Sequence, residues 1–361
     1  MKVKEFFFPG THPPGVEPPR EPVTADADLM RQLKAKAARL PYEGELASFD
    51  GAVGWINSER LTPDELQGKV VLVDFWTFTC VNWLRTFPYV KAWAQKYRDQ
   101  GLVVIGVHTP EFPFEGDIEN VRKQAKALGV DYPIAVDSNY GVWRAFDNNY
   151  WPALYVADAK GRIRAHHYGE GAYEMSEMIV QQLLADAGAS RLTDDLVSVH
   201  PEGTQVAADW NTLASGETYT GYQQAEGFTS PGGVKADRSH TYSVPDRLNL
   251  NDWALSGDWT ITGRAAVSNE PNGRIAFRFH ARDANLVMGP PKGTAPVRVR
   301  VLLDGEPARE ANGTDVDSQG QGRADDQRLY QLIRQPGEIE DRTLEIEFLD
   351  PGIEAYCFTF G

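Results

Sequence analysis

Between residues 45 and 188 the hydrophobic pattern alternates between strand-like and helix-like segments. Two apolar runs rich in β-branched residues, at 69–76 and 102–109, have the composition of strands buried on both faces. Residues 82–101 and 117–129 instead repeat their large apolar side chains at near-helical spacing, and each of these segments ends at a glycine. This order predicts an α/β unit with parallel strands at its centre.

The remainder of this unit is expected to close with a hairpin and a helix. Strands are expected at 132–137, 153–158 and 162–169, a short helix at 140–146, and a last helix at 173–188. The two strands of the hairpin are joined by an Ala-Lys-Gly turn. The unit is therefore expected to contain both parallel and antiparallel strands.

After about residue 190 the pattern changes to short runs of alternating polar and apolar residues. Runs such as 274–283, 297–305 and 354–361 are separated by clusters of Gly, Pro, Asn and Asp, and long stretches of helical period are missing. This pattern is typical of an all-β sandwich or jelly roll. A length of 361 residues also favours two domains over one.

Composition restricts the partners and the compartment. A net charge of −15 argues against nucleic acid or an anionic membrane as a partner, and no run approaches the length of a membrane span. Two cysteines exclude a disulfide framework and a cysteine-based zinc site, and no cofactor is expected. The apolar stretch near the start is too short for a signal peptide, which predicts a cytoplasmic protein. As part of a longer precursor, the same chain would be expected in the periplasm or outside the cell.

Cys80 is the first candidate for chemistry, because it directly follows a predicted buried strand and precedes a predicted helix. Free backbone N–H groups and the helix dipole stabilise a thiolate at such a place, which lowers the pKa of the thiol. The alternative is an inert, buried cysteine. Pro88 falls within the predicted helix, where it is expected to produce a kink, and Pro152 directly precedes a strand, where it suits a tight turn with a cis peptide bond.

The segment FWTFTCVNW at 75–83, followed by Pro88 and Pro152, resembles the thioredoxin superfamily in its TlpA/ResA-like and redoxin (AhpC/TSA) branch. The resemblance implies that Cys80 is the attacking cysteine, that Pro88 is the helix-kinking proline and that Pro152 is the cis-proline facing the active site. It covers roughly residues 45–187. Most of all, the chain resembles the thioredoxin-like and carbohydrate-binding-module-like region of DipZ-type cytochrome c biogenesis proteins.

Pattern and resemblance together predict an α/β thioredoxin-like fold followed by an all-β, jelly-roll-like sandwich. The expected regions are a Pro-rich N-terminal arm with a short helix (1–44), a thioredoxin-like redox domain (45–188), a linker (189–204) and a carbohydrate-binding-module-like β-sandwich (205–361).

Trp83 stands where a dithiol oxidoreductase has its second, resolving cysteine. The sequence therefore predicts a monothiol oxidoreductase, in which Cys80 forms mixed disulfides with a thiol or disulfide substrate and an external thiol acts as the reductant. A one-cysteine peroxidase is the first alternative, because Thr77 precedes Cys80 by three positions and either Arg85 or Arg144 could stabilise the thiolate. The second is a non-catalytic protein that binds peptides or glycans.

Several residues are expected around Cys80. The neighbours predicted from position along the chain are Trp76, Thr77, Thr79, Trp83, Pro88, His108, Glu111, Trp151 and Pro152. His108 and Glu111 follow a buried strand at its carboxyl end, and His108 could donate a proton near the thiol. The aromatic residues, together with Phe78 and Tyr150, either line a groove or pack in the interior.

Weaker candidates lie in the second domain. Asp315, Asp317 and Asp326 have the spacing of a calcium loop, although a plain acidic hairpin loop explains them better. A set of aromatic residues looks exposed and suits stacking on a carbohydrate, but such residues also fill sandwich cores; these are Trp210, Tyr219, Tyr222, Trp253 and Trp259. Cys357 is expected to be a small buried hydrophobe rather than a partner for Cys80.

Overall fold

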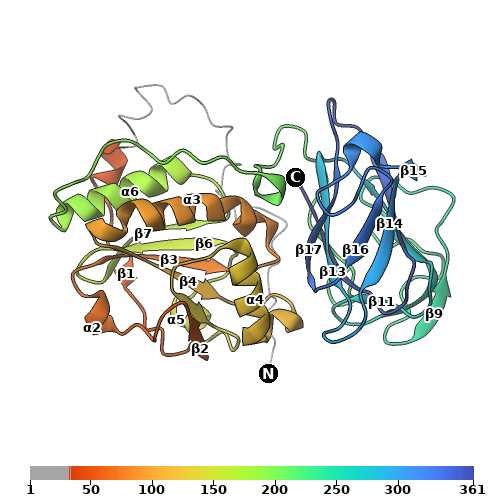
Figure 1. Cartoon of the computed structure of the whole chain (residues 1–361), viewed down its shortest axis with the longest axis horizontal. Helices are drawn as coiled ribbons and strands as arrows, with labels where there is room; N and C mark the ends of the chain where they lie inside the picture. The colour runs from red at the N-terminus through yellow and green to blue at the C-terminus, as the bar shows by residue number, and fades with distance from the viewer. Residues whose placement is uncertain (1–31, 33) are drawn as a thin grey trace. The chain divides into compact units, whose positions relative to one another are not determined.

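The computed structural model describes residue 32 and residues 34–361, so most of the predicted N-terminal arm lies outside the described residues. The described chain forms two compact units that meet in sequence between Gln205 and Val206 (Figure 1). The first is an α/β unit and the second is built from β-strands. This confirms the predicted fold class of a thioredoxin-like fold followed by a strand-rich domain.

The α/β unit is organised around a seven-stranded sheet with the order β1-β7-β6-β3-β4-β5-β2. Its strands are β1 (Gly44–Glu45), β2 (Gly54–Ile56), β3 (Val70–Trp76), β4 (Leu102–His108), β5 (Ile134–Val136), β6 (Ala153–Ala157) and β7 (Arg162–Tyr168). The neighbours β3, β4 and β5 are parallel, and the other pairs are antiparallel. All seven residues of β3 are buried, as expected for a central strand covered on both faces.

Helices cover both faces of this sheet (Figure 1). The helices are α2 (Pro63–Leu66), α3 (Val81–Tyr97), α4 (Ile118–Leu128), α5 (Gly141–Ala145) and α6 (Tyr173–Asp186). The long helices α3 and α6 lie on one face, whereas α2 and α5 lie on the other and share a hydrophobic core with the side chains of Val71, Val73 and Phe75. α4 ends at the predicted glycine, because Gly129 takes the left-handed conformation directly after it. α3 ends earlier than predicted, at Tyr97, and a 3₁₀ turn separates it from the left-handed Gly101.

Strand register brings three distant segments to one edge of the sheet. Trp76, the last residue of β3, pairs with His108 at the end of β4, and Phe75 pairs with Ala153 at the beginning of β6. The loops that follow β3 and β4 therefore leave the sheet beside the turn that contains Pro152. Cys80 lies in the first of these loops.

The second unit is one antiparallel sheet of twelve strands that bends onto itself. One layer contains β12 (Gly273–Phe279), β14 (Val297–Leu303), β15 (Glu306–Pro307), β16 (Gln321–Ala324) and β18 (Arg342–Phe348). The other contains β8 (Thr218–Tyr219), β9 (Ser239–Tyr242), β11 (Ala266–Ser268), β13 (Asp283–Gly289), β17 (Arg328–Arg334) and β19 (Glu354–Phe360). β10 (Trp253–Ile261) belongs to both, because its first half pairs with β12 and its second half with β9 and β11.

Aromatic side chains from the two layers meet in the core of this unit. Phe277 of β12 lies 5.0 Å from Phe358 of β19 between ring centroids, and Trp259 of β10 packs edge-on against Phe348 of β18. Trp253 is likewise fully buried. Of the two alternatives left open by the sequence, Trp253 and Trp259 follow the one in which they fill the core, because both lie on the inward side of β10.

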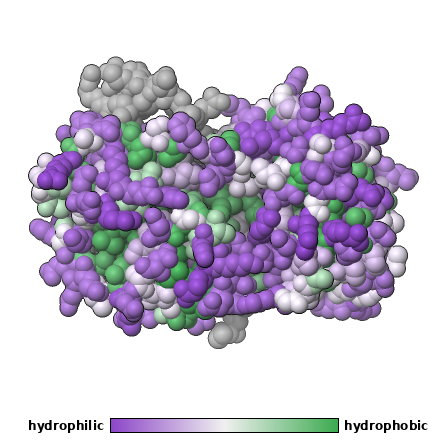
Figure 2. Space-filling model, viewed as in Figure 1, coloured by the Kyte–Doolittle hydropathy of each residue, from purple (hydrophilic) through white to green (hydrophobic). Residues whose placement is uncertain are grey.

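Few large apolar side chains are exposed among the described residues. Figure 2 shows hydrophobic positions in several separate places between hydrophilic ones on the visible face. In the α/β unit the exposed examples are Tyr42 and Val53, and in the β unit they are Tyr222, Val234, Val244 and Leu250. Tyr222 is the one residue of the predicted sugar-stacking set that is clearly exposed, and its hydroxyl donates to Asp237.

The packing of the α/β unit can be tested at Gly141, whose backbone lies close to that of Gly51. A Cβ added at Gly141 would lie 2.7 Å from the Cα of Gly51, so Gly141→Ala forces the backbone to move although alanine favours the helix. We expect a loss of about 1–3 kcal/mol in the free energy of unfolding, measured by urea denaturation. Gly116→Ala is the matched control, because its Cβ would meet open space. Equal stability of the two variants would contradict the contact.

Candidate functional site

Cys80 lies at the junction between β3 and α3. It is the N-cap residue of α3, its backbone N–H donates to the Thr77 carbonyl over 3.2 Å, and its carbonyl accepts from the N–H of Leu84 over 3.0 Å. The side chain is partly exposed and forms no disulfide. A nucleophile at this position combines access from solvent with the positive end of a seventeen-residue helix.

Trp83 occupies the position of a second cysteine and is completely buried. Its ring stacks on Trp76 with a centroid distance of 4.2 Å and also packs against Phe87. The indole Nε1 donates to Oδ2 of Asp74 over 3.0 Å. Trp83 and Trp76 are therefore parts of the interior, so of the two alternatives left open by the sequence the structure has packing and not a groove for this pair.

Asp74 is a carboxyl group in the middle of the central strand. Besides Trp83, it accepts a hydrogen bond of 3.1 Å from the hydroxyl of Tyr132, while its other oxygen has no partner among the described residues. Burial raises the pKa of Asp74 to about 7, although the two donated hydrogen bonds act in the opposite direction. With a pKa near neutral, this carboxyl gains or loses its proton close to physiological pH.

His108 is also fully buried, at the end of β4. Its Nε2 lies 3.4 Å from the hydroxyl of Thr77, and burial lowers the pKa of the imidazole to about 3. His108 is therefore neutral at physiological pH. The prediction that it donates a proton near the thiol fails for the imidazolium form, because the strand places the ring in the interior.

A second buried carboxyl, Glu115, joins the two loops at this edge of the sheet. One of its oxygens accepts from the hydroxyl of Thr79 over 2.6 Å, and the other accepts from the backbone N–H groups of Glu111 and Phe112 over 2.7 and 2.9 Å. Burial raises its pKa, opposed by these hydrogen bonds. Glu115 thereby holds the residue before Cys80 against the loop that follows β4, and the side chain of Glu111 remains partly exposed.

The remaining predicted neighbours lie beside these loops. The Trp151–Pro152 peptide bond is cis, and Pro152 is buried with its carbonyl accepting from the N–H of Gly169 over 2.8 Å. Trp151 is partly exposed, and its indole donates to the Thr109 carbonyl over 3.1 Å. Pro88 lies in the interior of α3.

The two arginines considered as anion-binding residues are engaged elsewhere. Arg85 and Glu170 form an ion pair of 2.9 Å, with each side chain only 3% exposed. Arg144 is exposed and donates to the Asn139 carbonyl over 2.8 Å. The Arg85–Glu170 pair connects α3 to the loop after β7, and removing either partner alone would leave a buried charge.

The structure does not assemble the weaker candidates into sites. The carboxylate of Asp317 accepts backbone N–H groups of its own turn, from Gln319 and Gln321. The carboxylate of Asp315 accepts from the backbone N–H of Gln331 in β17 and pairs with Arg328. Within the described residues, no group of three or more His, Cys, Asp or Glu side chains, Asp326 included, is arranged as metal ligands. Cys357 is buried in β19. None of the helices described is both long and apolar enough to span a bilayer.

Asp74, Glu115 and Glu170 were not predicted from the sequence as members of the site. Asp74 could have been found from the sequence, because a carboxyl within an otherwise apolar strand must be stabilised by hydrogen-bond donors elsewhere in the fold. Glu115 and Glu170 could not, since their partners Thr79 and Arg85 lie 36 and 85 positions away.

The raised pKa of Asp74 predicts a pH-dependent stability. Its pKa in the unfolded chain is near the ordinary 3.8 and in the fold about 7, so the folded state binds the extra proton between these values. With respect to this group the folded state is most stable below pH 4. The free energy of unfolding then decreases as the pH rises to 7, by on the order of 1 kcal/mol per pH unit. Asp74→Asn keeps the acceptor for Trp83 and should remove this slope. Urea unfolding of both proteins from pH 4 to 8 measures the difference, and parallel curves would contradict the assignment.

Comparison with known proteins gives two family matches. Residues 57–183 match the Redoxin family, and residues 215–361 match the family described as thioredoxin like C-terminal domain. Protein DipZ of Mycobacterium bovis is 39% identical over 344 residues, which are 94% of this chain but 46% of that protein, so the chain spans about half of this relative.

Shorter proteins match about two fifths of the chain. Thiol-disulfide oxidoreductase YkuV of Bacillus subtilis is 34% identical over 142 residues, 39% of this chain and 95% of that protein. A thioredoxin-like protein whose solution structure was solved in the oxidized form is 31% identical, with a TM-score of 0.37, and the match covers 40% of this chain and 96% of that one. The Redoxin match and the 34% identity with YkuV show that the chain belongs to the redoxin family of thioredoxin-like proteins.

Proposed function

We propose that this protein is a monothiol thiol-disulfide oxidoreductase that acts through Cys80. The observation that carries the proposal is the contrast between Cys80, which caps α3 and is partly exposed, and Trp83, which is buried and bonded to Asp74. The relatives include a protein named as a thiol-disulfide oxidoreductase, which supports the reaction class.

The reaction would proceed in two exchange steps. The Cys80 thiolate attacks one sulfur of a substrate disulfide, a new S–S bond forms to Cys80, and the other substrate sulfur leaves as a thiolate. An external thiolate then attacks the substrate sulfur of this mixed disulfide, which releases Cys80 as a thiolate and leaves the external thiol joined to the substrate. No net oxidation of the protein occurs, and a second external thiol completes reduction of the substrate.

Two features of the fold support an external thiol for the second step. The only other cysteine, Cys357, is 1% exposed within the β unit, and its Sγ lies 3.3 Å from the Phe358 carbonyl oxygen. Position 83 presents an indole that has no redox chemistry with a disulfide. Peroxide reduction is less favoured, because the arginines that would stabilise a peroxide oxygen, Arg85 and Arg144, already have partners.

The first test is the reactivity of Cys80 as a function of pH. Alkylation by iodoacetamide, followed by intact mass spectrometry, should give an apparent pKa about one unit or more below the 8.5 of a free thiol. Oxidised glutathione should form an adduct that dithiothreitol removes. Cys80→Ser should form no adduct, and buried Cys357 serves as the internal control. A Cys80 pKa at or above 8.5 would overturn the proposal.

The second test restores a resolving thiol with Trp83→Cys. Residues three apart at the start of a helix are close enough for a disulfide, so mild oxidation should join Cys80 to the introduced thiol and lower the mass by two hydrogen atoms. Glutathione adducts at Cys80 should then become short-lived. Trp83→Ala is the matched control: both variants should lose about 3–5 kcal/mol of stability, but only the cysteine variant gains the disulfide. A folded Trp83→Cys variant that keeps its glutathione adduct would contradict the proposal.

A further inference from the structure

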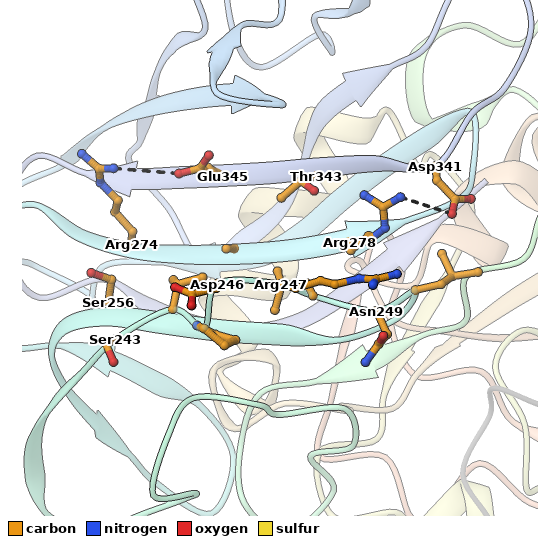
Figure 3. A pocket seen from close by; sticks show the side chains of 15 residues that line it. Ser243, Asp246, Arg247, Asn249, Ser256, Arg274, Arg278, Asp341, Thr343 and Glu345 are labelled. Carbon is orange, nitrogen blue, oxygen red and sulfur yellow. Dashed lines mark hydrogen bonds and ion pairs between the residues drawn. The ribbon is translucent and has the colours of Figure 1, made fainter.

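The β unit contains a cavity of about 800 Å³ on the outward face of the layer formed by β10, β12 and β18 (Figure 3). Its floor is made by side chains that alternate outward along these strands, and one wall is the loop at 243–250, which follows β9. A volume of this size is typical of sites for small molecules. Nothing in the redox chemistry proposed above uses it.

Small residues in the floor create the depth of the cavity. Along β12 the outward residues are Arg274, Ala276 and Arg278, and Ala276 pairs with Ala254 of β10. Leu248 of the loop packs against these two alanines. The short methyl groups leave space between the longer arginine side chains on either side.

Two guanidinium groups in this cavity have unused hydrogen-bonding capacity. Arg247 is exposed and makes no hydrogen bond or ion pair with another residue in the described part of the chain. Among the described residues the guanidinium of Arg278 contacts one carboxylate, that of Asp341 at 3.5 Å, and this carboxylate has a closer contact of 2.7 Å with His280. In Figure 3 the side chains of Arg247 and Arg278 both extend toward the end of the cavity at Asn249 and Asp341.

Two acidic residues that line the cavity, Asp246 and Glu345, lie away from the end to which Arg247 and Arg278 extend. Glu345 lies 3.8 Å from Arg274, which in turn holds Glu347 at 3.0 Å, so the arginine at the other end of the cavity is already neutralised. Asp246 lies near Ser256 in Figure 3, away from the end to which Arg247 extends. The positive charge that has no acidic partner among the described residues is therefore that of Arg247, at the end of the cavity where Arg278 pairs with Asp341.

We propose that this cavity binds a small organic anion, with its carboxylate or phosphate group held by Arg247 and Arg278. The guanidinium fork matches both groups in a bidentate geometry. Hydroxyl and amide side chains that line the cavity, such as Ser243, Thr343 and Asn249, suit a hydroxylated ligand body. Among the described residues that line it there is no aromatic side chain, so recognition relies on charge rather than on ring stacking.

Because the net charge of the protein is −15, its overall charge cannot account for the binding of an anion. The field of the whole protein repels anions, so general electrostatic attraction does not produce anion binding on this chain. Any affinity for a small anion must come from a local arrangement of positive groups.

The test compares three ligands that share one ring. Isothermal titration of the full chain at low ionic strength is done with D-glucuronate, D-glucose 6-phosphate and D-glucose, which carry a carboxylate, a phosphate and no charge. We expect at least one of the two anions to bind, with millimolar affinity or tighter, and glucose not to bind. The anion that binds more tightly identifies the preferred group.

Variants locate the binding. Arg247→Gln and Arg278→Gln should each weaken the affinity about tenfold, and the double variant should lose it. Arg247 has no partner in the described part of the fold, so its replacement leaves the structure intact even if Arg278→Gln disturbs the Asp341 contact. Arg298→Gln is the control, because Arg298 is exposed on β14 and pairs with Asp350 outside the cavity. Absence of anion binding, equal binding of glucose, unchanged affinity of the double variant, or an equal loss in Arg298→Gln would each overturn the proposal.

Discussion

The hydrogen bond from the Trp83 indole to the Asp74 carboxyl connects the helix that carries Cys80 to the central strand of the sheet. A carboxyl buried in a strand needs donors, and here they come from Trp83 and Tyr132. The first turn of α3 is consequently fixed by an interaction in the interior. Because Cys80 is the N-cap of that turn, its position at the protein surface is fixed as well.

Around this connection the site contains two buried polar groups with different tasks. Glu115 joins the loop before Cys80 to the loop after β4 through one side-chain and two backbone hydrogen bonds. The Arg85–Glu170 pair fastens α3 to the loop after β7. Neither group needs to touch the substrate, yet both restrict the loops from which a substrate would approach the thiol.

The sequence predicted the α/β layout and the place of Cys80, because strand and helix periods are local and strong. The same periods do not show which side of an element is covered. Hence the sequence left open whether His108 acts beside the thiol and whether Trp253 and Trp259 stack on a sugar or fill the core, whereas in the structure all three are buried. The contacts of Glu115 and Glu170 join residues far apart in the chain, and the cavity lined by Arg247 and Arg278 forms between the loop after β9 and strands distant in sequence, so neither could be read from local pattern.

The packing of Trp83 also has a consequence for how the family pattern can change. Tryptophan and cysteine codons differ by one nucleotide, so a dithiol protein is genetically a single step away from this sequence. The fold makes that step difficult, because a cysteine would empty the space between Trp76 and Phe87 and remove a donor from Asp74. A change to the dithiol pattern would therefore need compensating changes in the core, and packing opposes it more than mutational distance does.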